Sequence, residues 1–430
     1  MSYKKQRGNA RTQRPERSQV EMQLMSLDEM VEPDHRVRLV WQYVELLDLS
    51  EFYAGIKSTE DNVGRPPIDP QILLALWLYA TIEGIGSARK LAKRTTDTIP
   101  FMWICGGVGV NHHTLSDFRS LNGERMEKLM VKTIAVLVEQ GLIPLETIAQ
   151  DGMRVRASAG AGSLRRKPTL KKLLKDAKQH CESLKDEAEA EELTERRRAA
   201  RKRAAEEKAR RVAQAIEELE EVDEKREQYK RKTDETRAST TDPEARRMKM
   251  SNGGFNPAFN VQFATDGEQR VIVGFDITNS GGDGGLMAPM FDQLCANYGR
   301  IPVEYLVDGP YAKRDDITKL EGHGTVVLAP IPMKSSMEKK GTDPHARQPR
   351  DTDEMAAYRA RMGTEEAKDR FKLRSSIAEF PNADCRNRGL KQFVVRGLRR
   401  AKGQAMLHVH AYNFMRFLNL GFLNALRGAN

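Results

Sequence analysis

The chain has 430 residues, of which 39% are hydrophobic and 31% charged, and its formal net charge is +10 at pH 7. This length exceeds that of one ordinary domain, and the hydrophobic fraction is enough for a substantial core. The positive charge favours a polyanionic partner, either nucleic acid or an acidic membrane surface. The four cysteines have no zinc-binding spacing, and no run of about 18 apolar residues marks a membrane helix. We therefore expect two or three domains of a reduced, cytoplasmic protein that does not span a membrane.

Residues 1–20 form a polar, basic arm that we expect to be disordered. From residue 21 to residue 142 the apolar residues recur with a helical period, which predicts an all-α domain. Within it, the segment IDPQILLALWLYATIEG begins with Asp69, a favourable N-cap residue, and Pro70, which suits the first helical position. We expect this helix to present one apolar face and to end before Gly84.

A short basic segment, SARKLAKRT, follows and predicts a second helix that starts at Ser87. A helix, a glycine turn and a basic helix are together typical of a helix-turn-helix DNA-binding motif. The alternative is a plain helical domain whose exposed faces are basic. The residues of this segment that we expect to contact DNA are Arg89, Lys90, Lys93 and Arg94.

A second candidate of this kind is NHHTLSDFRSLNGERMEKLM. Thr114 and Asp117 have the spacing of a capping box, so we expect a helix to begin there. Its Leu115 and Phe118 would face a core. Arg119 would face outward and contact DNA.

Residues 165–235 differ from the rest of the chain, because Lys, Arg, Glu and Ala dominate and aromatic residues are almost absent. Apolar residues recur in steps of three and four from Leu170 to Ala188, and again from Ala209 to Leu219, as in the seam of a coiled coil. We therefore predict a coiled-coil insertion of two long helices, arranged as an antiparallel hairpin. The charged run TERRRAARKRAAEEKARR within it is either a solvated helix face or a surface that contacts DNA backbone.

After the insertion the hydrophobic period changes to two, which indicates strands. FNPAFNVQFATD and QRVIVGFDITN predict a strand hairpin, GLMAPMFDQLCANYG a helix, PVEYLVDG a strand, KRDDITKLEGHG a helix and GTVVLAPIP a strand. A polar segment from Lys334 to Asp351 is expected to be flexible, and helices resume from about Asp353. With the strand that ends at Asp151, the order outside the insertion is three strands, a helix, a strand, a helix, a strand and a helix.

This element order is that of a ribonuclease-H-like domain, which we place at residues 143–164 and 236–430. In such a sheet the first strand is central and the fourth lies beside it, so Asp151 and Asp308, at the ends of those strands, would lie side by side. Glu379 lies on the helix after the fifth strand, which can pack across the same edge. The predicted fold class is therefore mixed α+β. A ribonuclease-H-like mixed sheet is interrupted by a coiled-coil insertion and preceded by an all-α, helix-turn-helix-like domain.

Three converging carboxylates are ligands that suit Mg²⁺ or Mn²⁺. Two such ions, about 4 Å apart, activate a water or a 3′-hydroxyl and stabilise the leaving oxygen in phosphodiester displacement. Without cations, crowded carboxylates repel one another and a pKa rises. We therefore expect two Mg²⁺ or Mn²⁺ ions at this site.

The sequence also resembles the DDE transposases of bacterial insertion sequences. TIAQDGMRVRASA is similar to that family's first-aspartate block, and YLVDGPYAKRDDITKL to its second-aspartate block. FKLRSSIAEFPNADCRNRGLKQFVVRGLRRAKGQAMLHVHAYNFMRFL is similar to the glutamate block and is the most specific part. TDPEARRMKMSNGGFNPAFNVQFATD resembles the second-strand block, and GRPPIDPQILLALWLYATIEG the helical N-terminal domain.

The resemblance implies that Asp151, Asp308 and Glu379 form a catalytic, metal-binding triad. Arg374 and Arg386 match basic positions that flank the glutamate. There they would hold DNA backbone through charge-assisted hydrogen bonds.

Other polar residues compete with these three acids for a place in the site, and each has a simpler structural interpretation. Helix capping is expected for Asp315 and Asp316, and Asp276 and Asp283 lie in a strand and a glycine-rich loop. The remaining competitors either lack the surroundings of the family block or lie in an apolar helix: Glu365, Glu366, His408, His410 and Asn413.

The predicted function is that of a transposase that binds the terminal inverted repeats of an insertion sequence, cleaves DNA with two metal ions and joins the exposed 3′-hydroxyls to target DNA. Two DNA ends must be held together, so we expect at least a homodimer on double-stranded DNA, in the nucleoid of a bacterium. A hydrolysis-only nuclease would use the same triad. A DNA-binding repressor with an inactive catalytic domain is the alternative from another class.

Overall fold

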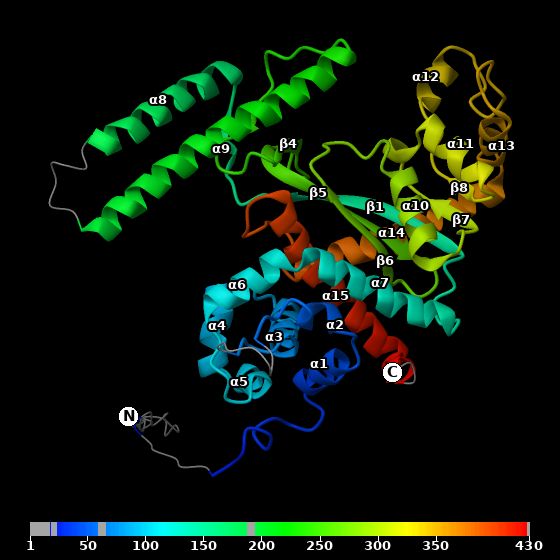
Figure 1. The fold of residues 1–430 in the computed structure, drawn as a ribbon. Coiled ribbons are helices and arrows are strands. Elements are labelled where there is room, and N and C mark those ends of the chain that lie inside the picture. The colour runs from blue at the N-terminus through cyan, green and yellow to red at the C-terminus, as the bar shows by residue number, and fades with distance from the viewer. Residues whose placement is uncertain (1–17, 19–23, 59–65, 187–193, 428–430) are drawn as a thin grey trace, which may run out of the picture.

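The computed structural model describes residues 18, 24–58, 66–186 and 194–427. Apart from Ser18, the predicted arm at residues 1–20 lies outside this part of the chain. The first described region consists of helices and their connections, as predicted (Figure 1). Its helices are α1 (Arg36–Glu45), α2 (Ser50–Tyr53), α3 (Pro70–Ile82), α4 (Ala88–Asp97), α5 (Ile99–Cys105), α6 (His112–Leu121) and α7 (Gly123–Glu139).

Helix α3 begins as predicted and forms the centre of this region. The Asp69 side chain accepts a hydrogen bond from the backbone N–H of Gln71, and Pro70 is in the first turn. The prediction of a single apolar face was wrong, because every residue from Leu73 to Ile82 is buried. A helix that is buried all round needs neighbours on every side. Helices α1, α5 and α6 supply them, together with the C-terminal helix α15 (Leu398–Leu420).

The starts of the next helices are determined by their cap residues. Ser87 caps α4 as predicted, and its side chain accepts a hydrogen bond from the N–H of Lys90. Helix α6 does not begin with the predicted capping box. Its N-cap is Asn111, whose side-chain oxygen accepts from the N–H of Thr114 at 2.9 Å. The helix therefore starts earlier than predicted, and Asp117 lies within it rather than in its capping turn.

Arg119 of α6 is buried, which contradicts the prediction that it faces outward. The residue is 4% exposed, its guanidinium lies 4.6 Å from the centre of the Trp77 ring, and its Nη1 donates to the carbonyl of Gly86 at 2.6 Å. Burial lowers the pKa of this guanidinium to about 10. The physical reason is helical periodicity: Arg119 lies four residues after Leu115, on the same buried face. A side chain in this position cannot reach DNA.

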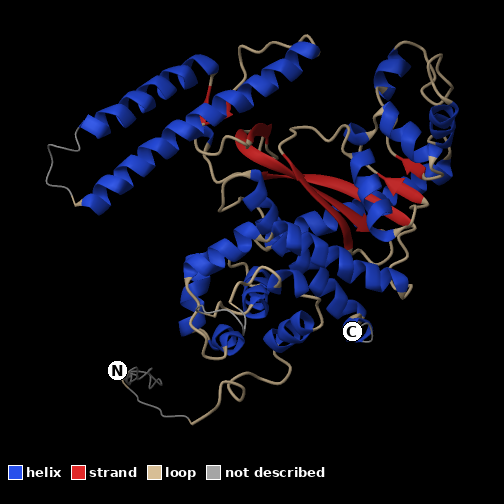
Figure 2. Ribbon diagram, in the orientation of Figure 1, coloured by secondary structure: helices blue, strands red, loops and turns tan. Residues whose placement is uncertain are grey.

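An eight-stranded mixed sheet forms the second region (Figure 2). Its main part has the order β6-β5-β1-β7-β8, in which β1 is central, β5 and β6 run antiparallel to their neighbours, and β7 and β8 run parallel to β1. This is the order expected for a ribonuclease-H-like sheet, with the fourth strand of the motif beside the first. The strands are β1 (Thr147–Arg156), β5 (Phe255–Asp266), β6 (Ile272–Thr278), β7 (Glu304–Leu306) and β8 (Val326–Leu328).

Three short strands that the sequence did not indicate extend this sheet at the base of the insertion. They are β2 (Leu164–Arg165), β3 (Ala238–Ser239) and β4 (Arg246–Lys249). Arg165 pairs with Ala238, and Arg246 pairs with Ala258 of β5. Segments of two to four residues are too short to show an alternating pattern. Their pairing nevertheless joins the two ends of the insertion to the sheet.

The helices of the second region follow the predicted order. They are α10 (Met287–Tyr298), α11 (Arg314–Gly322), α12 (Lys334–Lys339), α13 (Asp353–Arg361), α14 (Glu365–Asn387), α15 and α16 (Leu423–Arg427). The prediction of a flexible segment from Lys334 to Asp351 was wrong at both ends. The segment begins with α12 and ends at buried Asp351, whose carboxylate lies 2.7 Å from Arg359 Nε and 3.0 Å from Arg314 Nη2.

The insertion contains two long helices, α8 (Lys167–Asp186) and α9 (Glu195–Gln228), which lie side by side (Figure 1). They share a small core with the base of the insertion, made of Leu170, Val212, Ala215, Leu219 and Ala238. Three residues of the predicted seam, Leu170, Val212 and Leu219, are buried in this small core. Ala209 and Ile216 are only half-buried, and Ala188 lies outside the described residues.

Helix α15 joins the two regions. It contacts α3, α6 and α7 on one side and strand β6 on the other. Its Phe414 ring packs against Tyr43 of α1, and its Asn413 side chain bonds both the N–H and the carbonyl of Ile272 in β6. The helices and the sheet therefore share one hydrophobic core. None of the described helices is long and apolar enough to cross a membrane.

Candidate active site

Asp151 and Asp308 are brought together by the register of β1 and β7. Ala149 pairs with Leu306 in the parallel ladder, and the two aspartates each lie two residues farther along. We predicted that strand β1 ends at Asp151. The strand instead continues to Arg156, because β5 remains paired with it over that length. Strand β7 does end at Leu306, so the sheet opens beside Asp151 where Asp308 begins the next turn.

Glu379 lies within α14, which packs across β1 and β5. Two residues later Pro381 lies inside the same helix. A proline has no N–H to donate and therefore removes one helical hydrogen bond beside Glu379. The helix places Glu379 over the opening of the sheet, and its side chain remains 62% exposed.

One guanidinium touches all three acids. Arg374 Nη1 lies 3.9 Å from Asp151 Oδ1, and Arg374 Nη2 lies 3.7 Å from Asp308 Oδ1 and 3.8 Å from Glu379 Oε1. These separations are too long for hydrogen bonds, so the contacts are electrostatic. Nη1 is buried and has no hydrogen-bond partner. Arg374, which the sequence placed beside the glutamate as a DNA ligand, thus lies among the carboxylates.

Asn382 completes this group, and the sequence did not single it out. Its Nδ2 donates a hydrogen bond to Asp151 Oδ2 at 2.9 Å. Asn382 is 6% exposed, and its Oδ1 is buried without a hydrogen-bond partner. The available signal was its position three residues after Glu379, which puts both side chains on the same side of the helix.

Asp151 is the innermost of the three acids. Burial raises its pKa to about 6, and the neighbouring Arg374 opposes that rise while Asp308 and Asp283 add to it. The side chain of Asp151 is 23% exposed, against 51% for Asp308. Asp151 therefore has an unfavourable environment for its charged form, which a bound cation would improve.

A polar network supports the floor of the site. Tyr311, which follows Asp308, donates to Gln262 Oε1 at 2.5 Å, and Gln262 Nε2 donates to Asp283 Oδ1 at 3.2 Å. Asn260 Nδ2 also donates to Asp283, at 2.7 Å. Gly152 makes room for these side chains, because a Cβ atom there would lie 2.2 Å from Gln262 Nε2. Asp283 thus has its own partners beside the triad.

The donor atoms of the site suit a hard divalent cation. The three carboxylates and the buried amide oxygen of Asn382 are all oxygen donors, the kind that Mg²⁺ and Mn²⁺ prefer. In the part of the chain that the structure describes, no three acidic, histidine or cysteine side chains are close enough to hold one ion. The guanidinium of Arg374 lies between the acids instead.

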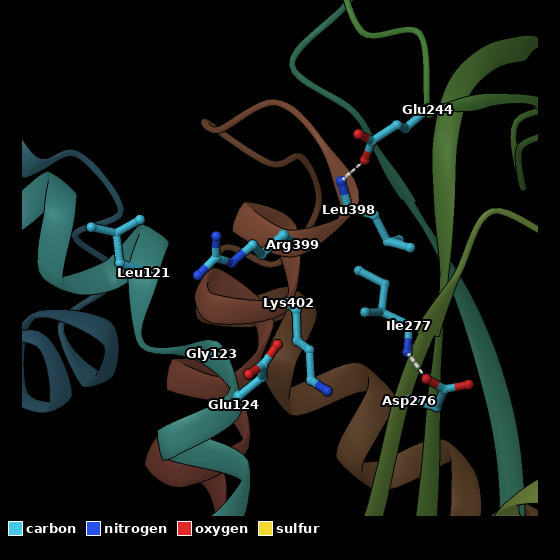
Figure 3. Close-up of a pocket in the computed structure, with 9 residues that line it drawn as sticks. All are labelled: Leu121, Gly123, Glu124, Glu244, Asp276, Ile277, Leu398, Arg399 and Lys402. Atoms are coloured by element: carbon cyan, nitrogen blue, oxygen red, sulfur yellow. Dashed lines mark hydrogen bonds between the residues drawn. The ribbon is translucent and has the colours of Figure 1, made fainter. Parts of the chain in front are cut away.

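Apart from Asp283, which lies beside Asp151, the competing acids lie elsewhere in the described structure. Asp315 and Asp316 are in the first turn of α11, and Glu365 and Glu366 are in the first turn of α14, where acidic residues favour a helix. A separate pocket of about 380 Å³, between α6, α7, β6 and α15, contains Asp276 (Figure 3). None of the three predicted catalytic acids lines that pocket.

The histidines of α15 pack in the core, as expected. His408 and His410 are both buried, and burial lowers their pKa values to about 3 and about 4. A ring nitrogen of His410 lies 2.8 Å from the carbonyl of Met126 in α7. Asn413 bonds the backbone of Ile272, so these residues connect helices and sheet.

A basic groove adjoins the acids. It has a volume of about 540 Å³ and begins at Gly152, next to Asp151. Arg386, the other basic residue predicted to flank Glu379, is exposed on its wall. The charged residues that line it are Arg154, Arg156, Lys249, Asp283, Arg386 and Lys391.

The basic residues of α4 are accessible at the other end of the molecule. Arg89, Lys90 and Lys93 are exposed, and Arg94 is half-buried with its Nη1 3.5 Å from Asp97. Of the predicted DNA ligands in the helical region, only Arg119 is buried.

The strand order and the three acids are compatible with a ribonuclease-H-like nucleic-acid enzyme. Comparison with protein families narrows this class. Residues 25–121 match a transposase domain (DUF772), and residues 225–414 match a transposase DDE domain. Both matches are to transposase domains, and together they are consistent with a DDE transposase of insertion sequences. The second match includes Asp308 and Glu379, whereas Asp151 precedes it and joins them through the sheet. No curated protein and no solved structure matches the chain.

Proposed function

We propose that the chain binds the terminal inverted repeats of an insertion sequence, cleaves DNA at those ends and joins them to target DNA. The observation that carries this proposal is the convergence of Asp151, Asp308 and Glu379 on one guanidinium. The matches to two transposase families support the same class of reaction.

The proposed reaction has two steps at phosphorus. In the first, a water oxygen forms a bond to phosphorus, the P–O3′ bond breaks, and the released 3′-oxygen takes up a proton. In the second, that 3′-hydroxyl attacks phosphorus in the target, loses its proton and displaces another 3′-oxygen. Divalent cations, when bound, activate the attacking oxygen and stabilise the leaving oxygen.

The residues of this chain have distinct roles in the proposal. Asp151, Asp308 and Glu379 hold two Mg²⁺ or Mn²⁺ ions, and Asn382 orients Asp151. Arg374 balances the carboxylate charges before cations bind. In the groove, Arg386 and its basic neighbours hold the DNA backbone through charge-assisted hydrogen bonds.

The exposed cations of α4 contact the terminal repeats, with the helical region as the recognition domain. Phosphate contacts of this kind give binding that weakens steeply with salt. Two ends must be held for joining, so the active form is at least a homodimer.

The proposal is tested by cleavage and strand transfer on DNA that carries the ends of the element. We expect Asp151→Asn, Asp308→Asn and Glu379→Gln each to lower the rate of both steps by roughly 10³-fold or more, because residues that act as one unit fail together. DNA affinity should remain. Asp276→Asn and Glu365→Gln serve as matched controls that leave both rates unchanged. Equal losses in the controls would show that the triad is wrongly assigned.

The same assay separates the alternatives. A hydrolysis-only nuclease would release 3′-hydroxyls but join none of them to target DNA. A repressor would bind the ends and cleave nothing with either cation, in wild-type and variant proteins alike.

A further inference from the structure

The basic half of α9, residues 195–211, is strongly charged and is not used by the carboxylate site. It contains nine arginines and lysines and three glutamates, whereas residues 217–228 of the same helix contain seven acidic and two basic residues. One helix therefore carries positive charge on its first half and negative charge on its second.

The acidic half is held by the body of the protein. Arg246 Nη2 in β4 lies 2.7 Å from Glu218 and 3.4 Å from Glu221, and Lys167 Nζ in α8 lies 3.0 Å from Glu220. These ion pairs fix the second half of α9 against the sheet. Much of its negative charge is thereby balanced within the chain.

The basic half of α9 extends beyond the sheet (Figure 1). Every residue from Thr194 to Ala204 is exposed. In the described structure Arg196, Arg197 and Lys202 make no ion pair, and the pair Arg211–Glu207 has a separation of 3.8 Å. The positive charge of these three side chains is thus not balanced by an acid in the described structure.

This placement of charge does not serve the stability of the helix. The N-terminal end of a helix carries a partial positive charge that disfavours cations by a few tenths of a kcal/mol each. The first turn of α9 nevertheless contains three arginines after Glu195. A structural role for the helix would be met better by acidic residues there.

The surface also lacks what a protein partner would bind. Between Glu195 and Arg211 the only apolar residues are alanines. Interfaces between proteins depend on a few large buried anchors, which alanine cannot provide. A regular row of cations without anchors instead fits a polyanion whose charges are also regularly spaced.

A cleft of about 610 Å³ continues the basic half into the body. It is formed by α6, α9 and the segment before α15. Two of its acids point into the protein, because Asp242 accepts from the N–H of Gly397 and Glu244 from the N–H of Leu398. Its arginines come from separate elements, and Nε of Arg211 is buried without a hydrogen-bond partner. Arg119 contributes only to the buried wall of this cleft, and the other charged residues that line it are Asp117, Glu207, Arg210, Arg211, Asp242, Glu244, Arg396 and Arg400.

We propose that the basic half of α9 and this cleft form a second DNA-contact surface. This surface lies apart from the carboxylate site and binds the backbone of duplex DNA. The inference rests on the proposed function in taking double-stranded DNA as the substrate. The basic half is about 25 Å long at the helical rise, so it covers less than one turn of duplex. It contacts phosphates and does not read sequence.

The test measures the affinity of the full chain for a duplex of random sequence as a function of salt. The α9 variant carries Arg196→Gln, Arg197→Gln and Lys202→Gln. Glutamine is a good helix former, so the helix is retained, which circular dichroism checks. The control variant removes the same charge at exposed positions of another part of the protein, with Arg300→Gln, Lys339→Gln and Lys340→Gln.

In the α9 variant we expect the slope of log affinity against log salt to become less steep by about 2–3, since each lost phosphate contact contributes about 0.9. Affinity at low salt should fall roughly 10- to 100-fold. The control should change the slope little. Equal changes in the two variants would mean that only net charge matters, and the surface proposal would fail.

The α9 variant could instead change its oligomeric state while the slope of log DNA affinity against log salt stays the same. That result would make this surface a contact between copies of the chain, which also overturns the proposal. Cleavage is measured separately. DNA binding that is weakened in the α9 variant, without any cleavage by the wild type, supports this surface and rejects the proposed function. Cleavage by the wild type, with DNA binding that is unchanged in the α9 variant, supports the proposed function and rejects this surface.

Discussion

At the scale of single residues, Asn382 is the contact most open to test. Its amide donates to Asp151 and its buried oxygen has no partner, so it orients a carboxylate whose position matters. We expect Asn382→Ala to lower kcat for DNA cleavage by roughly 10- to 100-fold, the usual effect of losing an orienting partner at a metal site. DNA affinity should not change.

Asn387→Ala is the matched control, because Asn387 is exposed on the same helix. A loss of the same size in that variant would mean that α14 as a whole, rather than the contact with Asp151, is sensitive to substitution.

The raised pKa of Asp151 makes the response to cations depend on pH. Its folded pKa of about 6 exceeds the ordinary aspartate value of 3.8, so the folded state binds this proton more tightly. The contribution of Asp151 to stability is therefore greatest below about pH 4 and falls as pH rises to about 6. A cation competes with that proton. We expect MnCl₂ to raise the melting temperature more at pH 7.5 than at pH 5.

Thermal melting with and without MnCl₂ at the two pH values measures this effect. Asp308→Asn should reduce the shift at pH 7.5. A shift that is equal in the variant and the wild type would place the cation elsewhere.

Arg119 shows how burial removes a residue from a surface. Replacing a buried charge by an apolar group of similar volume is often neutral or stabilising. We expect Arg119→Met to leave the free energy of unfolding unchanged or to raise it by about 1 kcal/mol, with no effect on DNA affinity. Denaturant unfolding and DNA titration measure the two quantities.

Arg89→Gln, at an exposed position of α4, provides the contrast, since it should weaken DNA binding without affecting stability. Weaker DNA binding by folded Arg119→Met would contradict the assignment of Arg119 to the core.

At the scale of elements, the crossing of α15 with the α6–α7 junction depends on two glycines. A Cβ atom on Gly403 would lie 2.0 Å from the carbonyl oxygen of Arg119, and one on Gly123 would lie 3.0 Å from the Gly403 nitrogen. We expect Gly403→Ala to destabilise the protein by about 2 kcal/mol or more, because backbone must move to admit the methyl group.

Gly322→Ala is the control for this prediction, since Gly322 ends α11 with open space around its Cα. Alanine there should be neutral or slightly stabilising. Denaturant unfolding that gives equal free energies for the two variants would show that α15 does not pack so closely.

Most elements could be predicted because their signals are local. Asp69 and Ser87 cap helices within three residues of themselves, and alternation in 255–266 marks β5 without reference to the rest of the chain. The short strands β2, β3 and β4 form only because neighbouring strands pair with them. Asn111 was missed as the cap of α6 because a second capping pattern follows it within the same segment.

At the scale of the whole molecule, the insertion is separable from the shared core. Its apolar residues form their own cluster, and Arg165 pairs with Ala238 where it leaves the sheet. Replacing residues 166–237 by Asn-Gly would close β2 and β3 as a two-residue hairpin. We expect this variant to fold with a single cooperative transition and a melting temperature within a few degrees of the full chain, measured by calorimetry.

The same variant should keep cleavage of short end substrates and lose part of the salt dependence of DNA binding. An unfolded or insoluble product would mean that the insertion contributes to the main core.

The sequence by itself determined the class of each long element, and it led us to predict the insertion and to propose three acids for one site. Hydrophobic period, cap residues and family blocks are all read within a few residues, so no knowledge of distant partners is needed. Only the tertiary structure decided that Arg374 lies among the acids, that Asn382 holds Asp151 and that Arg119 is buried. Each of these depends on how segments far apart in the chain pack, as when β1 and β7 pair in register. Local sequence carries no information about that register, because backbone hydrogen bonds and apolar burial specify it only when the whole sheet forms.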